Sequence, residues 1–131
     1  MEQKIHIATQ YGLHDGTLVT DRGSKLQLGP QDNGFAPYEL LLGGLSFCLF
    51  STFDSIAQKM QLTYSSVDID VTGVKRDEKV ATLKTCSIAV VAQGVEDEAK
   101  FNKAFEVATR YCSVFNTIAK VAEMEWNITF S

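Results

Sequence analysis

The stretch GFAPYELLLGGLSFCLFSTFDSIAQKM, residues 34–60, decides the fold of this chain. Pro37 is suited to the first turn of a helix, because its missing N–H would be unpaired there and its φ is already helical. Glu39 then places a negative charge near the positive end of the helix dipole. Between residues 40 and 53 nearly every position is apolar or small, which is typical of a helix that is buried on most sides. Serine and threonine interrupt the run and leave it too short for a bilayer, so we predict a core helix that ends near Met60.

Cys48 lies in the middle of this predicted helix, on a face of mostly small groups. Gly43 and Gly44 each cost about 1 kcal/mol relative to alanine inside a helix. A second backbone or a ligand that approaches this face closely would offset the cost. Taken alone, Cys48 is also consistent with a small buried hydrophobic residue. The face consists, at helical spacing, of Leu41, Gly44, Leu45, Cys48, Ser51, Thr52 and Ser55.

Length, charge and cysteine content limit the class of protein. The chain has 131 residues, and we expect them to form one domain, 1–131, with a substantial core. The net charge of −4, without a cluster of Lys or Arg, argues against nucleic acid as a partner. The N-terminal MEQKIHIATQ lacks the apolar segment of a signal peptide, and three cysteines do not suggest a disulfide framework. We therefore expect a cytoplasmic protein that binds neither nucleic acid nor membrane.

The other segments predict an α+β domain around the core helix. Alternating apolar and polar residues in 66–75 and 83–93 predict two strands of a hairpin. Residues 96–113 combine an acidic opening with one apolar stripe, which indicates a second amphipathic helix. The remaining expected elements are a strand at 4–9, a meander of short antiparallel strands up to residue 28, a shorter helix at 114–121 and a closing strand at 124–130.

Two of the three cysteines lie on inward faces of predicted helices. Cys112 belongs to the apolar stripe of the second helix, whereas Cys86 alternates with Ile88 and Val90 and is expected to be a core thiol. A pair of cysteines that the fold brings together can cycle between dithiol and disulfide. The first would attack an oxidant as a thiolate, and the second would resolve the sulfenic acid that results.

This chemistry needs a positive group near Cys48, because apolar surroundings raise the pKa of a thiol. The basic residues that could supply it are His14, Arg22, Arg76 and Arg110. A Cys–His hydrolase would instead need His6 or His14 beside Cys48. The histidines and cysteines lack metal-ligand spacing, and no phosphate-binding glycine motif is present. We therefore expect no metal, nucleotide or other bound cofactor.

Two motifs in the chain resemble those of a known family. The segment APYELLLGGLSFC, residues 36–48, resembles the P-x-E-L-L-L-x-x-L-x-x-C signature of the OsmC/Ohr family of osmotically induced and organic hydroperoxide resistance proteins. The segment RYCSV, residues 110–114, resembles the second cysteine motif of that family, and is most similar to an OsmC-like branch that reads Tyr-Cys-Ser-Val. The order of expected elements also agrees over essentially the whole chain.

The resemblance implies a fold, an assembly and an activity. It implies antiparallel sheets packed around a long buried central helix, in an intertwined homodimer with two identical sites at the interface. Members of the family reduce organic hydroperoxides with two cysteines and are recharged by a dithiol reductant. The motif positions would make Cys48 the peroxidatic thiol and Cys112 the resolving one.

The chain departs from the family pattern near the first cysteine. Better-known members stabilise the thiolate with an Arg on the N-terminal meander, where this chain has His14, with Arg22 farther along. A Glu ten residues before the first cysteine normally holds that Arg. Here that position is Tyr38, and the adjacent Glu39 points about 100° away around the helix. The second motif also has Ser113 where many members have Pro.

We predict a stress-response oxidoreductase that reduces organic hydroperoxides by this two-cysteine mechanism. The alternative hypothesis is a non-catalytic or differently acting OsmC-like dimer that binds a small apolar ligand in the interfacial pocket. The two hypotheses differ in whether Cys48 and Cys112 are oxidised as peroxide is consumed.

Overall fold

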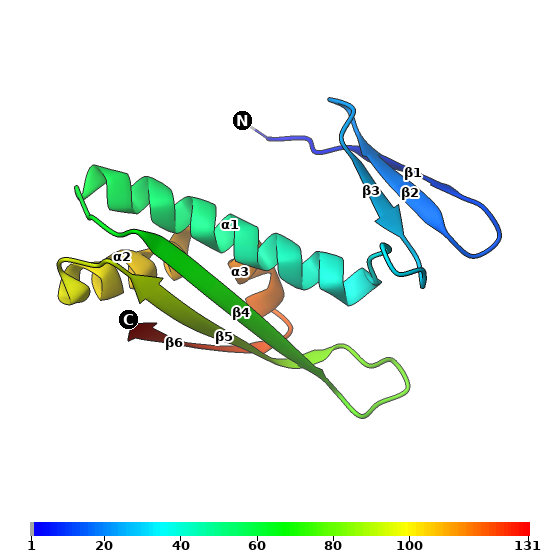
Figure 1. Ribbon diagram of the computed structural model, residues 1–131. Helices are drawn as coiled ribbons and strands as arrows, with labels where there is room; N and C mark the ends of the chain where they lie inside the picture. The colour runs from blue at the N-terminus through cyan, green and yellow to red at the C-terminus, as the bar shows by residue number, and fades with distance from the viewer. Residues whose placement is uncertain (1) are drawn as a thin grey trace. The chain divides into compact units, whose positions relative to one another are not determined.

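The computed structural model describes residues 2–131 and divides into two compact units (Figure 1). One unit comprises the chain up to residue 41, and the other runs from residue 42 to residue 131. The division falls within the long helix α1, Pro37–Lys59. The expectation of one domain over 1–131 stays a prediction.

The unit that ends at residue 41 contains a three-stranded antiparallel sheet. Its strands are paired in the order of the sequence, which confirms the predicted meander. The turn between the second and third strands uses Gly23 at φ +93°, a conformation that costs glycine little. The first strand begins three residues later than expected. The three strands are β1 (Ile7–Tyr11), β2 (Gly16–Thr20) and β3 (Lys25–Leu28).

The start of α1 is fixed by a local cap. The backbone N–H of Ala36 donates to Glu39 Oε1 at 2.7 Å, so this carboxylate pairs an N–H that the helix itself leaves unpaired. Pro37 follows as the first helical residue, as predicted. The observed end at Lys59 lies one residue from the predicted end.

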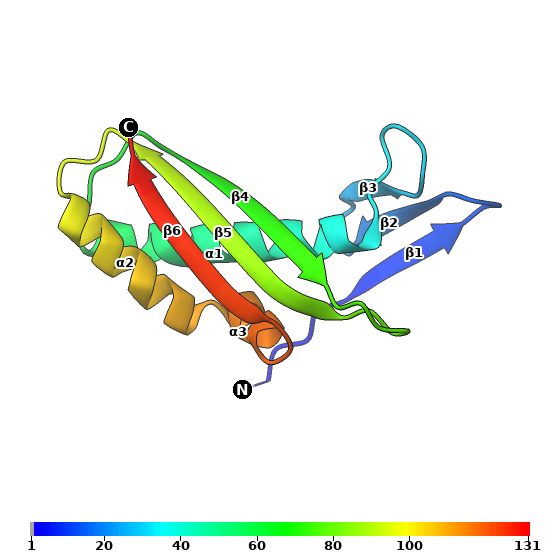
Figure 2. The same ribbon diagram turned by 90° about the horizontal axis from the view of Figure 1, so that it is seen from below.

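The larger unit holds a mixed sheet of three strands (Figures 1 and 2). Strands β4 (Ser66–Lys75) and β5 (Leu83–Gln93) form the predicted antiparallel hairpin, with Asp70 opposite Ala89. Strand β6 (Glu123–Phe130), however, pairs with β5 in parallel, so the expectation of purely antiparallel sheets was wrong. The physical reason is the helical crossover between them, which returns the chain to the same end of the sheet.

Two helices follow the hairpin, as predicted, but their ends are shifted. Helix α2 (Glu98–Tyr111) begins at an Asp97 cap, whose side chain accepts from the backbone N–H of Lys100. Cys112 is extended, at φ −71° and ψ 114°, and α3 (Ser113–Ala119) starts directly after it. Both predicted helical segments are therefore present, with the break moved to Cys112 itself.

Helix α1 contributes one stripe to the core of the larger unit. Phe53 packs against the rings of Phe101 and Phe105 on α2, with centroids 4.6 and 5.9 Å apart, and Phe101 meets Phe130 of β6 at 5.5 Å. Such tilted ring pairs are favourable beyond the area that they bury. The buried residues of α1 are Leu45, Leu49, Phe53 and Ala57, spaced four apart along one face.

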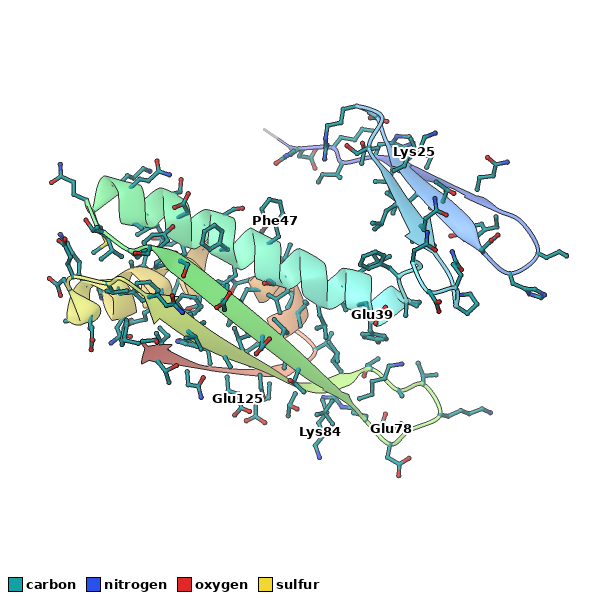
Figure 3. The ribbon with its side chains drawn as sticks, viewed as in Figure 1. Lys25, Glu39, Phe47, Glu78, Lys84 and Glu125 are labelled. Atoms are coloured by element: carbon teal, nitrogen blue, oxygen red, sulfur yellow. The ribbon has the colours of Figure 1, made fainter. Side chains whose placement is uncertain are left out.

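The opposite side of α1 is exposed, so the prediction of a helix buried on most sides was wrong for the single chain. Phe47 is 73% exposed and projects away from the sheet, whereas Glu125 projects from the far face of the sheet (Figure 3). A Cβ added at Gly43 or Gly44 would meet nothing within 4 Å. The expectation that the apolar run is too short for a bilayer was also wrong, because the 23 residues of the helix are long and apolar enough to cross a membrane. Core helices meet the same criterion, and the stripe packed on α2 is that of a core helix.

Candidate thiol site

Helix α1 places Cys48 at the edge of its buried stripe. Leu45 and Leu49, on either side in the sequence, are fully buried, whereas Cys48 is half-buried. The carbonyl of Cys48 accepts a hydrogen bond from Thr52 Oγ1 at 2.9 Å, within the same helix. A half-buried thiol at this edge is held by a rigid helix and still has access to small molecules.

The break between α2 and α3 brings a second cysteine to the same place. Cys112 is fully buried, its N–H ends α2 by donating to the carbonyl of Ala108 at 2.8 Å, and its Sγ caps α3 by accepting from the N–H of Phe115 at 3.4 Å. The following residue, Ser113, has its Oγ 4.0 Å from Cys48 Sγ. The three side chains of Cys48, Cys112 and Ser113 define what we call the thiol site.

Polar groups of the α2–α3 break decide the ionisation of Cys48. Burial pushes the pKa of the Cys48 thiol upward, but hydrogen bonds from the backbone N–H of Val114, the thiol of Cys112, and the hydroxyl and N–H of Ser113 outweigh it. The pKa of Cys48 is therefore lowered from its ordinary value. Hydrogen-bond donors aimed at the sulfur favour the thiolate without a full positive charge.

The pKa values of the other two cysteines are shifted upward. The pKa of Cys112 is raised to about 11, mainly by burial and also by the neighbouring Cys48, because a thiolate there favours a protonated partner. Burial alone raises the pKa of Cys86, which is fully buried on β5 as predicted for a core thiol. At neutral pH Cys112 is therefore protonated, and Cys48 is the sulfur of the pair that ionises first.

The basic residues suggested as activators have different surroundings. Arg76 donates to Thr82 Oγ1 and to the carbonyls of Leu83 and Val121. It therefore links the β4–β5 turn to the segment before β6. Arg110 pairs with Glu106 one turn earlier on α2, at 3.3 Å. Neither is among the groups that shift the pKa of Cys48.

The proposed supporting residues of the N-terminal segment belong to the other unit. His14 lines a cavity of that unit, Arg22 is exposed in the turn after β2, and Glu39 caps α1. Their assignment as activators of the thiol stays a prediction. His6, the other histidine considered, pairs with Asp21 at 2.8 Å. Within residues 2–131 no group of His, Cys, Asp and Glu side chains is arranged to hold a metal ion.

Sequence reasoning missed two functional features of this site. It took Ser113 only as a departure from a motif, although its hydroxyl faces Cys48. It also missed Asn116, whose side-chain amide binds three carbonyls at the α2–α3 break. A signal for the break was present, since Asn and Ser near an interrupted apolar stripe favour caps over helix interiors.

The fold and the site together define a class of protein: an α+β protein with two interacting cysteines, one on a central helix and one at the break between two later helices. Residues 29–127 match the family model described as OsmC-like protein. The chain therefore belongs to the OsmC-like family, as the two sequence motifs indicated.

Solved structures of the family share the fold. An OsmC like protein from Mycoplasma pneumoniae has a TM-score of 0.88 at 20% identity, over 99% of both chains. An organic hydroperoxide resistance protein from Elizabethkingia anophelis has a TM-score of 0.75 at 18% identity, over 100% of both chains. An organic hydroperoxide resistance protein OsmC from Legionella pneumophila has a TM-score of 0.71 at 16% identity, over 98% of this chain and 99% of that one. No functionally curated protein matches the chain.

Proposed function

We propose that this protein reduces organic hydroperoxides with Cys48 as the peroxidatic thiol and Cys112 as the resolving thiol. The observation that carries the proposal is a pair of opposite pKa shifts at two sulfurs that share a hydrogen bond: the pKa of Cys48 is lowered and that of Cys112 is raised to about 11. A two-step thiol peroxidase needs two thiols with different pKa values. The attacking sulfur must be a thiolate, and the resolving sulfur must react only after the sulfenic acid has formed. Relatives described as organic hydroperoxide resistance proteins support the same chemistry.

In the first step the Cys48 thiolate attacks one oxygen of the hydroperoxide. The O–O bond breaks, Cys48 becomes a sulfenic acid, and the alkoxide leaves and is protonated to the alcohol. The N–H groups of Ser113 and Val114 stabilise the thiolate before attack. The sulfur supplies both electrons, so this step needs no metal or bound cofactor.

In the second step the sulfur of Cys112 attacks the sulfenic sulfur of Cys48. A disulfide forms, and the hydroxyl of the sulfenic acid leaves as water with the proton of the Cys112 thiol. An external dithiol then reduces the disulfide by exchange and is itself oxidised. This reductant is the only partner that the cycle requires besides the peroxide.

Single-turnover kinetics with cumene hydroperoxide tests the proposal. The wild-type protein should consume one equivalent and form a Cys48–Cys112 disulfide, as peptide mapping would show. Cys112→Ser should consume the peroxide once and stop with Cys48 as a sulfenic acid that overoxidises with excess. Cys48→Ser should be inactive. Wild-type protein with both thiols free and the peroxide unconsumed after prolonged exposure would contradict the proposal.

We further propose that the protein is a homodimer that uses the exposed face of α1. Gly43 and Gly44 leave open space for a partner's backbone, and Phe47 is a large apolar side chain beside them. Gly44→Leu should therefore fold as a single chain yet weaken the dimer, because the added side chain overpacks the close approach. Light scattering at micromolar concentration is the measurement. A wild-type monomer under those conditions would contradict the proposed dimer.

A second candidate function, binding of a small apolar ligand, has its own supporting observation. The unit up to residue 41 contains a cavity of about 540 Å³ with mostly apolar walls, which include Tyr11, Leu28, Phe35 and Leu40. Volumes in this range suit small ligands. Two results together would favour this function. An apolar dye would bind with the same affinity before and after alkylation of both site thiols, and the protein would leave peroxide intact. In either case we propose a cytoplasmic location, where free thiols remain reduced.

A further inference from the structure

Asn116 makes an unusual set of hydrogen bonds for an exposed side chain. Its Nδ2 donates to the carbonyl oxygens of Cys112 at 2.8 Å, Thr109 at 3.0 Å and Arg110 at 3.3 Å. Two of these carbonyls belong to the last turn of α2, and the third belongs to Cys112 at the break itself. One amide therefore ties the end of α2 to the residue that carries the proposed resolving thiol.

Backbone hydrogen bonds also hold this break. Thr109 and Arg110 lie in the last turn of α2, where carbonyls lose their helical partners. The carbonyl of Cys112 starts α3 by accepting from the backbone N–H of Asn116 at 3.0 Å, and the side chain of the same Asn116 makes a second bond to it. Without the side chain, the extended Cys112 would be joined to α2 mainly through its own N–H and the carbonyl of Ala108.

The two sulfurs have to approach each other before a disulfide can form. The Cys112 sulfur accepts a hydrogen bond from the N–H of Phe115 at 3.4 Å, and the bond to Cys48 requires a separation of about 2.05 Å. If the main chain at Cys112 is held, a rotation of its side chain is enough. If the break is loose, the main chain samples other positions and the sulfur spends less time within reach.

We propose that Asn116 is a positioning residue that holds the main chain of Cys112 so that its sulfur can bond to Cys48. The inference rests on the proposed function, because it assigns a role in the resolving step. Asn116 contacts neither sulfur and is not a catalytic residue. Its place on the protein surface means that its loss is not expected to unfold the core.

Two substitutions and a matched control distinguish a positioning role of Asn116 from a general contribution to the stability of the fold. Asn116→Asp keeps the size but replaces the donor with a carboxylate that faces three carbonyl oxygens. Asn116→Gln keeps the donor on a longer arm and should retain part of the effect. Thr117→Ala is the control, since Thr117 Oγ1 also donates to a backbone carbonyl, that of Ser113 at 2.9 Å, but does not span the break.

Equilibration of the full-length protein in glutathione buffers gives a readout that needs no peroxide. Oxidised glutathione accepts two electrons from the thiols, forms the Cys48–Cys112 disulfide and leaves as two molecules of reduced glutathione. Asn116→Asp should lower the effective concentration of the Cys112 thiol toward Cys48 about tenfold, as expected when hydrogen bonds that fix a geometry are lost. With cumene hydroperoxide, the same variant should accumulate sulfenic acid while Cys48 is oxidised at the wild-type rate.

The outcomes are distinct. An Asn116→Asp effective concentration equal to that of wild type, or one matched by Thr117→Ala, would overturn the assignment. A slower oxidation of Cys48 in parallel with the loss of disulfide would also overturn it, because that is the signature of general destabilisation. Wild-type protein that forms the disulfide with glutathione but ignores the hydroperoxide would contradict the proposed function, while the glutathione titration would still decide the role of Asn116.

Discussion

Cys48 and Cys86 are both free thiols of the larger unit, and burial acts on both in the same direction. The pKa of Cys86 is raised because nothing opposes burial in the sheet. The pKa of Cys48 is lowered because the α2–α3 break presents N–H and O–H donors to its sulfur. The comparison teaches that the pKa of a half-buried thiol is set by the hydrogen-bond donors that face it, here those of the α2–α3 break.

The largest expected difference between the two thiols is their rate of alkylation. At pH 7 Cys48 should react with iodoacetamide at least about 100-fold faster than Cys86, since only the thiolate is nucleophilic and Cys86 is also buried. As pH rises, the rate at Cys48 should increase and level off at a lower pH than the rate of an ordinary thiol, because its pKa is lowered. Cys112, with a pKa of about 11, should still be rising at that point. Mass spectrometry of initial rates at each cysteine is the measurement, and equal rates at Cys48 and Cys86 would remove the distinction.

A smaller effect is expected when one donor to Cys48 is removed. Ser113→Ala deletes the hydroxyl 4.0 Å from Cys48 Sγ but keeps the backbone N–H groups. The pKa of Cys48 should rise, and its alkylation at pH 7 should slow about two- to fivefold, as for the loss of one weak hydrogen bond. Thr117→Ala, one turn farther along α3, is the matched control and should leave the rate unchanged. An unaltered rate in Ser113→Ala would show that the backbone N–H groups and the Cys112 thiol lower the pKa without the Ser113 hydroxyl.

The smallest effect on chemistry should come from Cys86 itself. Cys86→Ala should leave peroxide consumption and the Cys48–Cys112 disulfide unchanged, because the side chain is enclosed in the sheet core. It should lower the free energy of unfolding by about 1 kcal/mol through lost packing. Urea denaturation measures the loss. Abolished turnover in a folded Cys86→Ala protein would instead reassign the pair of functional cysteines.

Local patterns along the chain determined most of the elements. The run from Pro37 and the alternation in 66–75 and 83–93 predicted α1 and the β4–β5 hairpin almost to the residue. The two cysteine motifs indicated the family and the candidates Cys48 and Cys112. These features are readable because helical and strand periodicity, and the chemistry of a cap, are local properties of a sequence.

Tertiary structure decided the properties that depend on what faces a residue. The parallel pairing of β5 with β6 and the exposed side of α1 depend on contacts between distant segments. The ionisation of Cys48 is of the same kind, since its donors lie about 65 residues away in the chain. A sequence search for a positive charge could not find them, because backbone N–H groups are present at almost every residue and become specific only where the fold aims them.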